Sequence, residues 1–413
     1  MVYHTLVILD CNKTSVFLAL VVTLLSKLTL NQISRSKLYK FPPSPSRIPI
    51  LGHVHHVYGD GRAAFNAICK FLKIFKGNPI TVDLIHRRYV LLTSAHHAEI
   101  VLKSTALKSN DYKTVKALMG HGQTGNKPTL PTFVDALLEE YNPDEEGGAR
   151  QILDEVMTVL VGGQETTATE LSFALVMLAM HPREQEKVYQ EISQVLKDRS
   201  EKEVTLDDLT QLKYLDCVIN ETLRLFPALP LVSRELLETT DFGDCVLPKG
   251  LAVPIFIYET HRKPEVWQFP EEFRPSRFAS SDTAKRSQFS YIPFASGLRY
   301  CVGQKYALLQ MKTVLCTILR YFRVATAPGL EKMSDIQLEV NTTLKIYGGF
   351  NVVCHRRRLW ETSTENQKKG RGSSKIEKAK KRLERVGNEK KASRGIYVRP
   401  TESDYTSKVI SKL

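Results

Sequence analysis

The sequence lacks the cysteine spacing of a zinc site or of a disulfide framework. Its seven cysteines are scattered and odd in number, and no two of them form a C-x-x-C pair. Structural zinc sites and small disulfide-rich domains both depend on closely paired cysteines. We therefore expect free thiols in a reducing compartment, and a cysteine with a chemical role must act alone.

Net charge is nearly absent from most of the chain, although the whole sequence carries +14. Residues 356–413 hold 18 Lys plus Arg and 7 Asp plus Glu, which is +11, so the first 355 residues carry +3. The basic residues 356–413 are predicted to form a disordered tail. This tail could bind nucleic acid or anionic lipid, or it could be a solvated segment with no partner. Nucleic acid is not the expected partner.

The N-terminal apolar run, residues 15–30, is shorter than the roughly 20 residues of a membrane span. No small-x-small cleavage site follows it. Four basic residues lie at or beyond its C-terminal end: Lys27, Arg35, Lys37 and Lys40. Because basic residues favour the cytosolic side, residues 1–32 are predicted to be an anchor with the bulk of the chain in the cytosol. A cleaved signal peptide is the alternative.

The first part of the chain alternates between extended and helical patterns. Prolines at 41–53 favour a stiff connector. Residues 78–94 predict two short strands, and Ser94 is a plausible cap for the helix that follows. The polar, glycine-rich stretch 120–131 is expected to be a loop.

The second part is mostly helical. Long helices are expected at 151–180, 183–199, 206–226 and 304–322. Short strands and turns are expected at 228–260, and the proline- and aromatic-rich stretch 261–293 predicts a packed irregular loop.

A lone cysteine lies in a glycine-marked turn, FASGLRYCVG at 294–303. Gly297 and Gly303 permit positive φ and a close approach of the backbone to a flat ligand. A single thiolate from Cys301 suits the axial position of a haem iron, and Arg299 is placed to meet a haem propionate. A buried structural cysteine is the alternative, which the complete F-x-x-G-x-R-x-C-x-G pattern disfavours.

A second motif, GGQETT at 162–167, interrupts the longest apolar run. Two adjacent glycines cost about 1 kcal/mol each inside a helix. The polar pair Glu165 and Thr166 predicts a local opening of the helix beside a ligand, where an acid and an alcohol relay protons. The alternative is a kinked helix in which the hydroxyls bond to backbone carbonyls one turn earlier.

Charged residues at i,i+3 spacing form the third motif, ETLR. Glu221 and Arg224 lie on one helix face and can pair. Arg277, in PSRF at 275–278, is a candidate third member from the irregular loop. Alone, this pattern is common in helices.

The four motifs in this order resemble the cytochromes P-450, the haem-thiolate monooxygenases. The resemblance covers the proline connector, the early strands and nearly everything from about 131 to 355. It implies a mainly α fold with small β-sheets, in a domain at 33–355. The sequence of residues 291–315 is most similar to sequences of the animal fatty-acid-hydroxylating clade.

The resemblance implies that the chain binds haem through Cys301 as the axial ligand of the iron. Phe294 would pack by the thiolate, with Gly297 and Gly303 shaping the turn. Arg299 and Arg234, in LVSRE, would meet the two propionates.

The resemblance also implies roles for the other motifs. Glu165 and Thr166 resemble the acid–alcohol pair that feeds protons to the reaction. Glu221, Arg224 and Arg277 look like the structural triad that holds the haem-binding core.

The chain departs from the family pattern in its centre. The family's helix with Trp-x-x-x-Arg is absent, since the only tryptophans are Trp267 and Trp360. We therefore predict a fold that lacks part of its central helical block, with an internal deletion near 119–127. Such a deletion would expose apolar surface on the helix of Glu165. In addition, Ser276 stands where the family usually has glutamate.

Three functions compete. The first is a monooxygenase on the cytosolic face of the endoplasmic reticulum (microsomal) membrane, which takes electrons from NADPH through a membrane-bound reductase. It would insert one oxygen atom from O₂ into an apolar substrate, a fatty acid or a xenobiotic. The second is a shortened, non-catalytic isoform that binds haem poorly or not at all. The third is a binding module built on the basic tail.

Overall fold

The computed structural model describes ten stretches of the chain. These are residues 41–45, 53–54, 60–84, 87–104, 107–108, 133–143, 145, 147–196, 204–279 and 286–357. The predicted anchor, the loop at 120–131, the deletion point near 119–127 and the tail beyond residue 357 lie outside them. In the part of the chain that is described, no helix combines the length and the apolar character needed to cross a bilayer.

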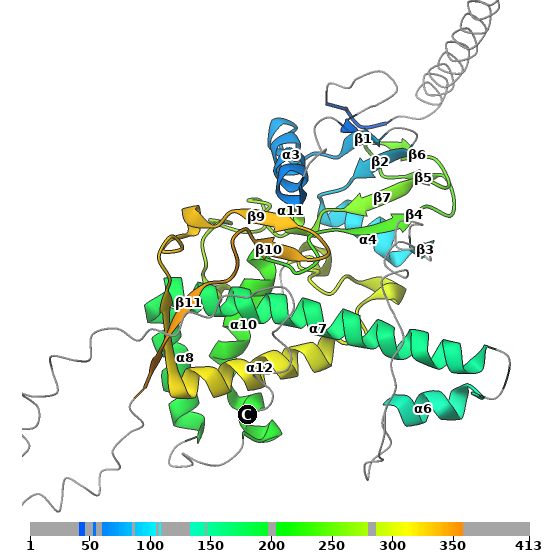
Figure 1. The fold of residues 1–413 in the computed structure, drawn as a ribbon. Helices are drawn as coiled ribbons and strands as arrows, with labels where there is room; N and C mark the ends of the chain where they lie inside the picture. Colours follow the sequence, from blue (N-terminus) through cyan, green and yellow to red (C-terminus); the bar gives the residue numbers. More distant parts are fainter. Residues whose placement is uncertain are drawn as a thin grey trace, which may run out of the picture.

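Helices are the commonest regular elements of the described chain, and α7 (Gly148–Met180) is the longest of them. In Figure 1 it crosses the middle of the molecule, with the helices that follow packed around its C-terminal half. The other α-helices are α3 (Gly61–Ile74), α4 (Ala95–Lys103), α6 (Phe133–Glu140), α8 (Pro182–Leu196), α9 (Leu206–Gln211), α10 (Lys213–Leu225), α11 (Ile257–Thr260) and α12 (Gln304–Tyr321).

A five-stranded sheet lies beside α3 and α4 (Figure 1). Its strand order is β1-β2-β7-β4-β3, in which β2 and β7 run parallel and the other neighbours antiparallel. The strands are β1 (Ile80–Leu84), β2 (Arg87–Leu91), β3 (Leu107–Lys108), β4 (Val232–Glu235) and β7 (Ala252–Ile255). The sheet therefore joins the start of the chain to the segment after α10.

The described residues also form three two-stranded sheets and four 3₁₀ turns. The sheets pair β5 (Thr240–Asp241) with β6 (Val246–Leu247), β8 (Phe322–Thr326) with β11 (Val352–Arg356), and β9 (Leu338–Val340) with β10 (Leu344–Ile346). The turns are η2 (Pro275–Phe278), η4 (Gln288–Ser290), η5 (Gly297–Arg299) and η6 (Met333–Asp335). The expectation of a mainly α fold with small sheets is confirmed.

Several local predictions are confirmed by hydrogen bonds and helix ends. Ser94 caps α4 by accepting the His97 N–H at 3.1 Å. The strands predicted in 78–94 are β1 and β2. α7 ends at His181, where the following proline disfavours a helical conformation. The six described cysteines are free thiols, as expected.

The single helix expected at 206–226 is wrong, because the structure has two helices that meet at Leu212. The backbone of Leu212 leaves the helical region (φ −78°, ψ 75°) while its side chain is fully buried. The N-terminus of the second helix, α10, is capped by a residue of α8. The Glu191 carboxylate accepts the N–H of Tyr214 at 2.6 Å and of Leu215 at 3.0 Å. Free N–H groups at a helix start need such partners.

The first half of α7 is largely uncovered. Between Gly148 and Thr167, none of the described residues of α7 is buried. Val159 and Leu160 are 49% and 55% exposed. Figure 1 shows this half projecting away from the rest of the molecule, with α6 alongside it. Exposed apolar surface on this helix was expected from the missing central block.

Candidate functional site

The cysteine turn, residues 294–303, is a hydrogen-bonded loop that contains η5 and leads into α12. The Cys301 N–H donates to the Phe294 carbonyl oxygen at 2.9 Å. α12 begins three residues after the cysteine, with Gly303 at its N-cap. Cys301 is an exposed free thiol, so the loop presents the sulfur next to the N-terminus of a helix, where a thiolate is stabilised.

Gly297 lets this loop pass against the end of α4. Its φ is +73°, and a Cβ at this position would lie 1.8 Å from the Leu102 carbonyl oxygen. Positive φ is strained for other residues, and the oxygen belongs to the backbone of a helix, so it cannot yield easily. Only glycine fits between the cysteine turn and α4.

We expect Gly297→Ala to lower the free energy of unfolding by at least about 1–2 kcal/mol, from the left-handed conformation alone. Gly163→Ala is the matched control. No atom lies within 4 Å of a Cβ at Gly163, and alanine in a helix interior is favoured over glycine by about 1 kcal/mol. Urea unfolding compares both variants with the parent chain. A Gly297→Ala midpoint equal to that of the parent would contradict this packing.

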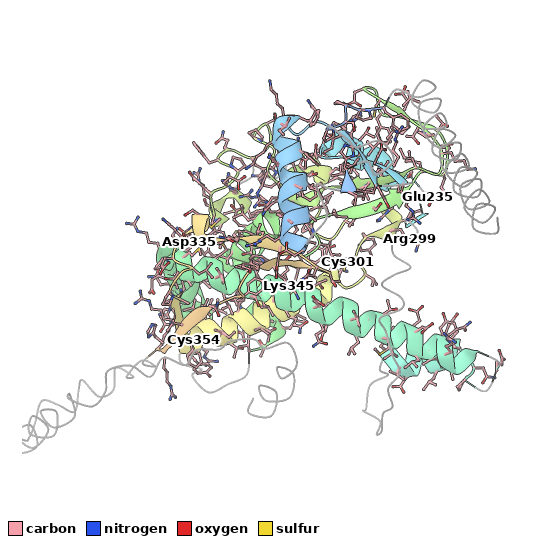
Figure 2. All side chains as sticks on the ribbon, turned by 45° about the horizontal axis from the view of Figure 1, so that its top comes forward. Glu235, Arg299, Cys301, Asp335, Lys345 and Cys354 are labelled. Carbon is pink, nitrogen blue, oxygen red and sulfur yellow. The ribbon has the colours of Figure 1, made fainter. Side chains whose placement is uncertain are left out.

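Apolar and basic side chains are exposed on both sides of Cys301. Leu298 and Val302 are 77% and 91% exposed, and Arg299 is also exposed. Figure 2 shows Arg299 and Cys301 on the segment that leads into α12. Haem offers a flat apolar face, anionic propionates and an iron that takes an axial thiolate. The residues of this loop supply a partner for each, so they fit haem on its thiolate side.

The two other predicted haem contacts are placed differently. Phe294 is half-buried and packs against the main hydrophobic core, while its carbonyl anchors the cysteine turn. Arg234 is buried on β4, and its guanidinium donates to the Ser233 carbonyl oxygen at 3.1 Å. Their roles toward haem remain predictions.

α7 runs without a break through Gly162 and Gly163, so the predicted local opening of the helix is wrong for this structure. The Thr166 hydroxyl donates to the Gly162 carbonyl oxygen at 2.6 Å. This is the backbone bonding that the sequence left as the alternative, and it satisfies the hydroxyl within an unbroken helix. Nothing lies within 4 Å of a Cβ at either glycine, so this turn of α7 borders open space.

Glu165 bonds to the C-terminal hairpin formed by β9 and β10. Its Oε1 accepts the Thr343 hydroxyl at 3.1 Å and lies 3.1 Å from the Lys345 ammonium. The acid and the alcohol of the GGQETT motif therefore have different partners in this structure. Their joint role in proton transfer remains a prediction.

The structure brings Glu221, Arg224 and Arg277 together. Arg224 donates from Nε to Glu221 Oε2 at 2.8 Å and from Nη2 to Oε1 at 2.9 Å. Arg277 donates from Nε to Oε1 at 3.1 Å. Glu221 and Arg224 are completely buried, and Arg224 also donates to the carbonyls of His261, Pro270 and Glu272. The three residues thus fasten α10 to the irregular loop.

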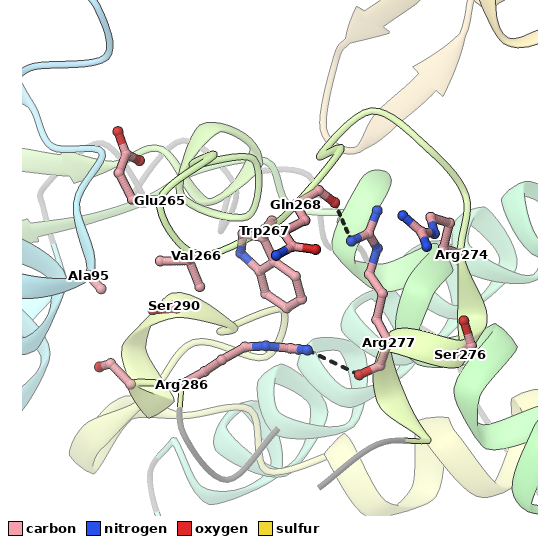
Figure 3. Close-up of a pocket in the computed structure, with 11 residues that line it drawn as sticks. Ala95, Glu265, Val266, Trp267, Gln268, Arg274, Ser276, Arg277, Arg286 and Ser290 are labelled. Atoms are coloured by element: carbon pink, nitrogen blue, oxygen red, sulfur yellow. Dashed lines mark hydrogen bonds between the residues drawn. The ribbon is translucent and has the colours of Figure 1, made fainter. Parts of the chain in front are cut away.

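A cavity of about 660 Å³ lies beside this triad (Figure 3). The Arg286 guanidinium lies over the Trp267 ring, 4.4 Å from its centre, and donates to the Arg277 carbonyl oxygen at 3.1 Å. Ser276, which replaces the usual glutamate of the family, also lines it. Cys301 does not line this cavity, whose lining residues all come from the irregular loop except Ala95 of α4.

His261 connects the triad to Ile292, two residues before the cysteine turn, and the sequence analysis missed it. Its Nε2 accepts the Ile292 N–H at 2.8 Å, and its Nδ1 lies 3.3 Å from the Arg224 carbonyl oxygen. Burial, with Arg224 nearby, lowers the pKa of His261 to about 3, so the ring is neutral and can accept at Nε2. A single histidine in a turn carries no sequence signal for such a bridge.

A buried carboxyl on α7, Glu170, was also missed. It is 4% exposed, and its Oε1 accepts the Ala228 N–H while its Oε2 is buried with no hydrogen-bond partner. Burial raises its pKa from 4.5 to about 8, with the Ala228 bond as an opposing effect. The folded chain therefore keeps a proton on Glu170 at neutral pH. The signal in the sequence was a glutamate within an apolar helical run.

The exposed Cys301 thiol at the N-terminus of α12 fits the iron ligand expected of a haem-thiolate protein. The cytochrome P-450 family model matches residues 122–347, which is more than half of the chain. The chain belongs to the cytochrome P-450 family.

Curated relatives support the finer assignment. Cytochrome P-450 4V2 of Mus musculus is 39% identical over 241 residues, covering 58% of this chain and 45% of that protein. Cytochrome P-450 4g1 of Drosophila melanogaster is 38% identical over 229 residues, covering 54% and 40%, and 4c3 of the same organism is 33% identical over 232 residues, covering 56% and 43%. All three belong to family 4 of the cytochromes P-450, so the predicted similarity to the fatty-acid-hydroxylating clade is confirmed. The match spans less than half of each relative.

Proposed function

We propose that this chain acts as a haem-thiolate monooxygenase that inserts one oxygen atom from O₂ into an apolar substrate, a fatty acid or a xenobiotic. The observation that carries the proposal is the exposed Cys301 thiol in its hydrogen-bonded turn at the N-terminus of α12. When bound, haem supplies the one-electron chemistry on O₂ that no side chain provides.

The residues of the cysteine turn have separable tasks. Cys301 binds iron as a thiolate, which the helix N-terminus favours over the thiol. Arg299 pairs with a propionate through a charge-assisted hydrogen bond. Gly297 keeps the turn close to α4, and the exposed side chains of Leu298 and Val302 lose contact with water when the flat ligand covers them.

Glu165 and Thr166 are assigned to proton transfer. Thr166 holds a proton on Oγ1 that the Gly162 carbonyl accepts in this structure, so the hydroxyl must turn from the helix to donate elsewhere. Glu165 is half-buried and ion-paired with Lys345, so solvent reaches its carboxylate.

The proposal includes a membrane location and a redox partner. The predicted anchor at residues 1–32 would hold the chain on the cytosolic face of the endoplasmic reticulum. There a membrane-bound NADPH reductase would supply electrons, and apolar substrates would reach the chain from the lipid bilayer.

The second candidate is a shortened, non-catalytic isoform. It is favoured by the uncovered first half of α7, where Val159 and Leu160 are exposed. A chain without the covering helices would lack a wall for haem and a roof for substrate.

Haem titration of the purified chain, followed by turnover, tests the proposal. We expect one haem per chain, and hydroxylated fatty acid only when reductase and NADPH are both present. Haem binding without product would support the non-catalytic isoform, and absence of haem binding would overturn the proposal.

A further inference from the structure

The C-terminal hairpin reaches Glu165 with two side chains. The Thr343 hydroxyl donates to Glu165 Oε1, and the Lys345 ammonium lies 3.1 Å from the same oxygen. Figure 2 shows Lys345 on this hairpin. Glu165 and Lys345 are each 38% exposed, so solvent weakens their attraction and leaves the ion pair alone a poor means of fixing the carboxylate.

Thr343 is the better-fixed of the two partners. It is 1% exposed, and its Oγ1 lies 3.3 Å from Oγ1 of Thr169. Because Thr343 uses its single proton toward Glu165, the Thr169 hydroxyl must donate to Thr343. Glu165 and Thr169 are four residues apart and share a face of α7, so one hydroxyl bridges two successive turns of the helix.

The backbone around Thr343 is held independently of these side chains. The Leu344 N–H donates to the Ala228 carbonyl oxygen at 2.8 Å. Lys345 pairs with Glu339 in the β9–β10 ladder. The backbone therefore fixes the position of the Thr343 hydroxyl, which can hold the Glu165 carboxylate in one orientation.

We propose that Thr343 is a positioning residue for Glu165, with Lys345 as the counter-ion, so that the C-terminal hairpin sets the orientation of this acid. The inference rests on the proposed proton-transfer role of Glu165. Thr166 bonds to Gly162 on a different face of α7, and the helix itself therefore does not orient the two groups toward each other.

Zero-length carbodiimide cross-linking of the full chain without haem tests this inference. The reagent joins a carboxylate to an adjacent amine, and mass spectrometry of the digested chain reports the Glu165–Lys345 peptide pair. We expect the cross-link in the parent chain, at least a threefold lower yield in Thr343→Val, and recovery of the parent yield in Thr343→Ser, which restores the hydroxyl.

Thr342→Val is the matched control, because Thr342 is the exposed neighbour, and it should leave the yield unchanged. If Thr343→Val does not fold, Thr343→Ala provides the same comparison with serine. A parent chain without the cross-link, or equal yields for the valine and serine variants, would overturn the inference. No haem is needed, so a chain that fails to bind haem would refute the proposed function and leave this result standing.

Discussion

Replacement of Glu221 by glutamine is expected to lower the free energy of unfolding by about 3–5 kcal/mol. The side chain keeps its size but loses the charge that faces Arg224, whose guanidinium is completely buried. Glutamine also has one acceptor oxygen fewer than glutamate, because an amide nitrogen replaces one carboxylate oxygen and then faces a donor. Oε1 accepts from Arg224 Nη2, the Arg274 N–H and Arg277 Nε, and Oε2 accepts from Arg224 Nε, so the amide nitrogen faces a donor in either orientation.

Chemical denaturation of the purified chain measures this loss. Glu272→Gln is the matched control, because that carboxylate is 59% exposed and lies 3.8 Å from Arg274. An exposed pair contributes about 0–1 kcal/mol, so the control should unfold close to the parent. Equal losses for the two variants would show that the triad does not hold the irregular loop.

Replacement of Glu170 by glutamine is expected to stabilise the chain at pH 8 and to flatten its stability between about pH 5 and pH 8. The pKa of Glu170 is about 8 in the folded chain and returns to 4.5 on unfolding. The folded state therefore binds more protons across this window, and stability falls as pH rises. Each pKa unit corresponds to about 1.4 kcal/mol, so the fall amounts to several kcal/mol.

Thermal unfolding as a function of pH measures this effect. Glutamine imitates the protonated acid, so Glu170→Gln should match the parent near pH 4.5 and exceed it at pH 8. Glu155→Gln, an exposed position on the same helix, is the control and should keep the parent's slope. An unchanged slope in Glu170→Gln would mean that the carboxyl is not buried as described.

The parts of the site that are local in sequence could be predicted. The cysteine turn is encoded within residues 294–303, where glycines, one arginine and one cysteine lie at fixed spacing. Glu221 and Arg224 lie on one helix turn, so their pairing follows from i,i+3 geometry. The same local reasoning identified Ser94 as a helix cap.

Long-range contacts could not be predicted from pattern alone. Glu191 caps α10 from a different helix, which is why one expected helix proved to be two. Thr343 contacts Glu165 across 178 residues, and His261 bridges α10 to Ile292, which precedes the cysteine turn. Each depends on tertiary packing that brings distant segments together.

The carbon monoxide difference spectrum of the reduced, purified chain tests the central claim most directly. Cys301→Ala removes the proposed ligand, and Cys354→Ala is the matched control because Cys354 is another exposed free thiol. We predict a red-shifted, thiolate-type Soret band in the parent and in Cys354→Ala, and its absence in Cys301→Ala. No haem spectrum in the parent, or the same band in Cys301→Ala, would contradict the assignment of Cys301 as the iron ligand.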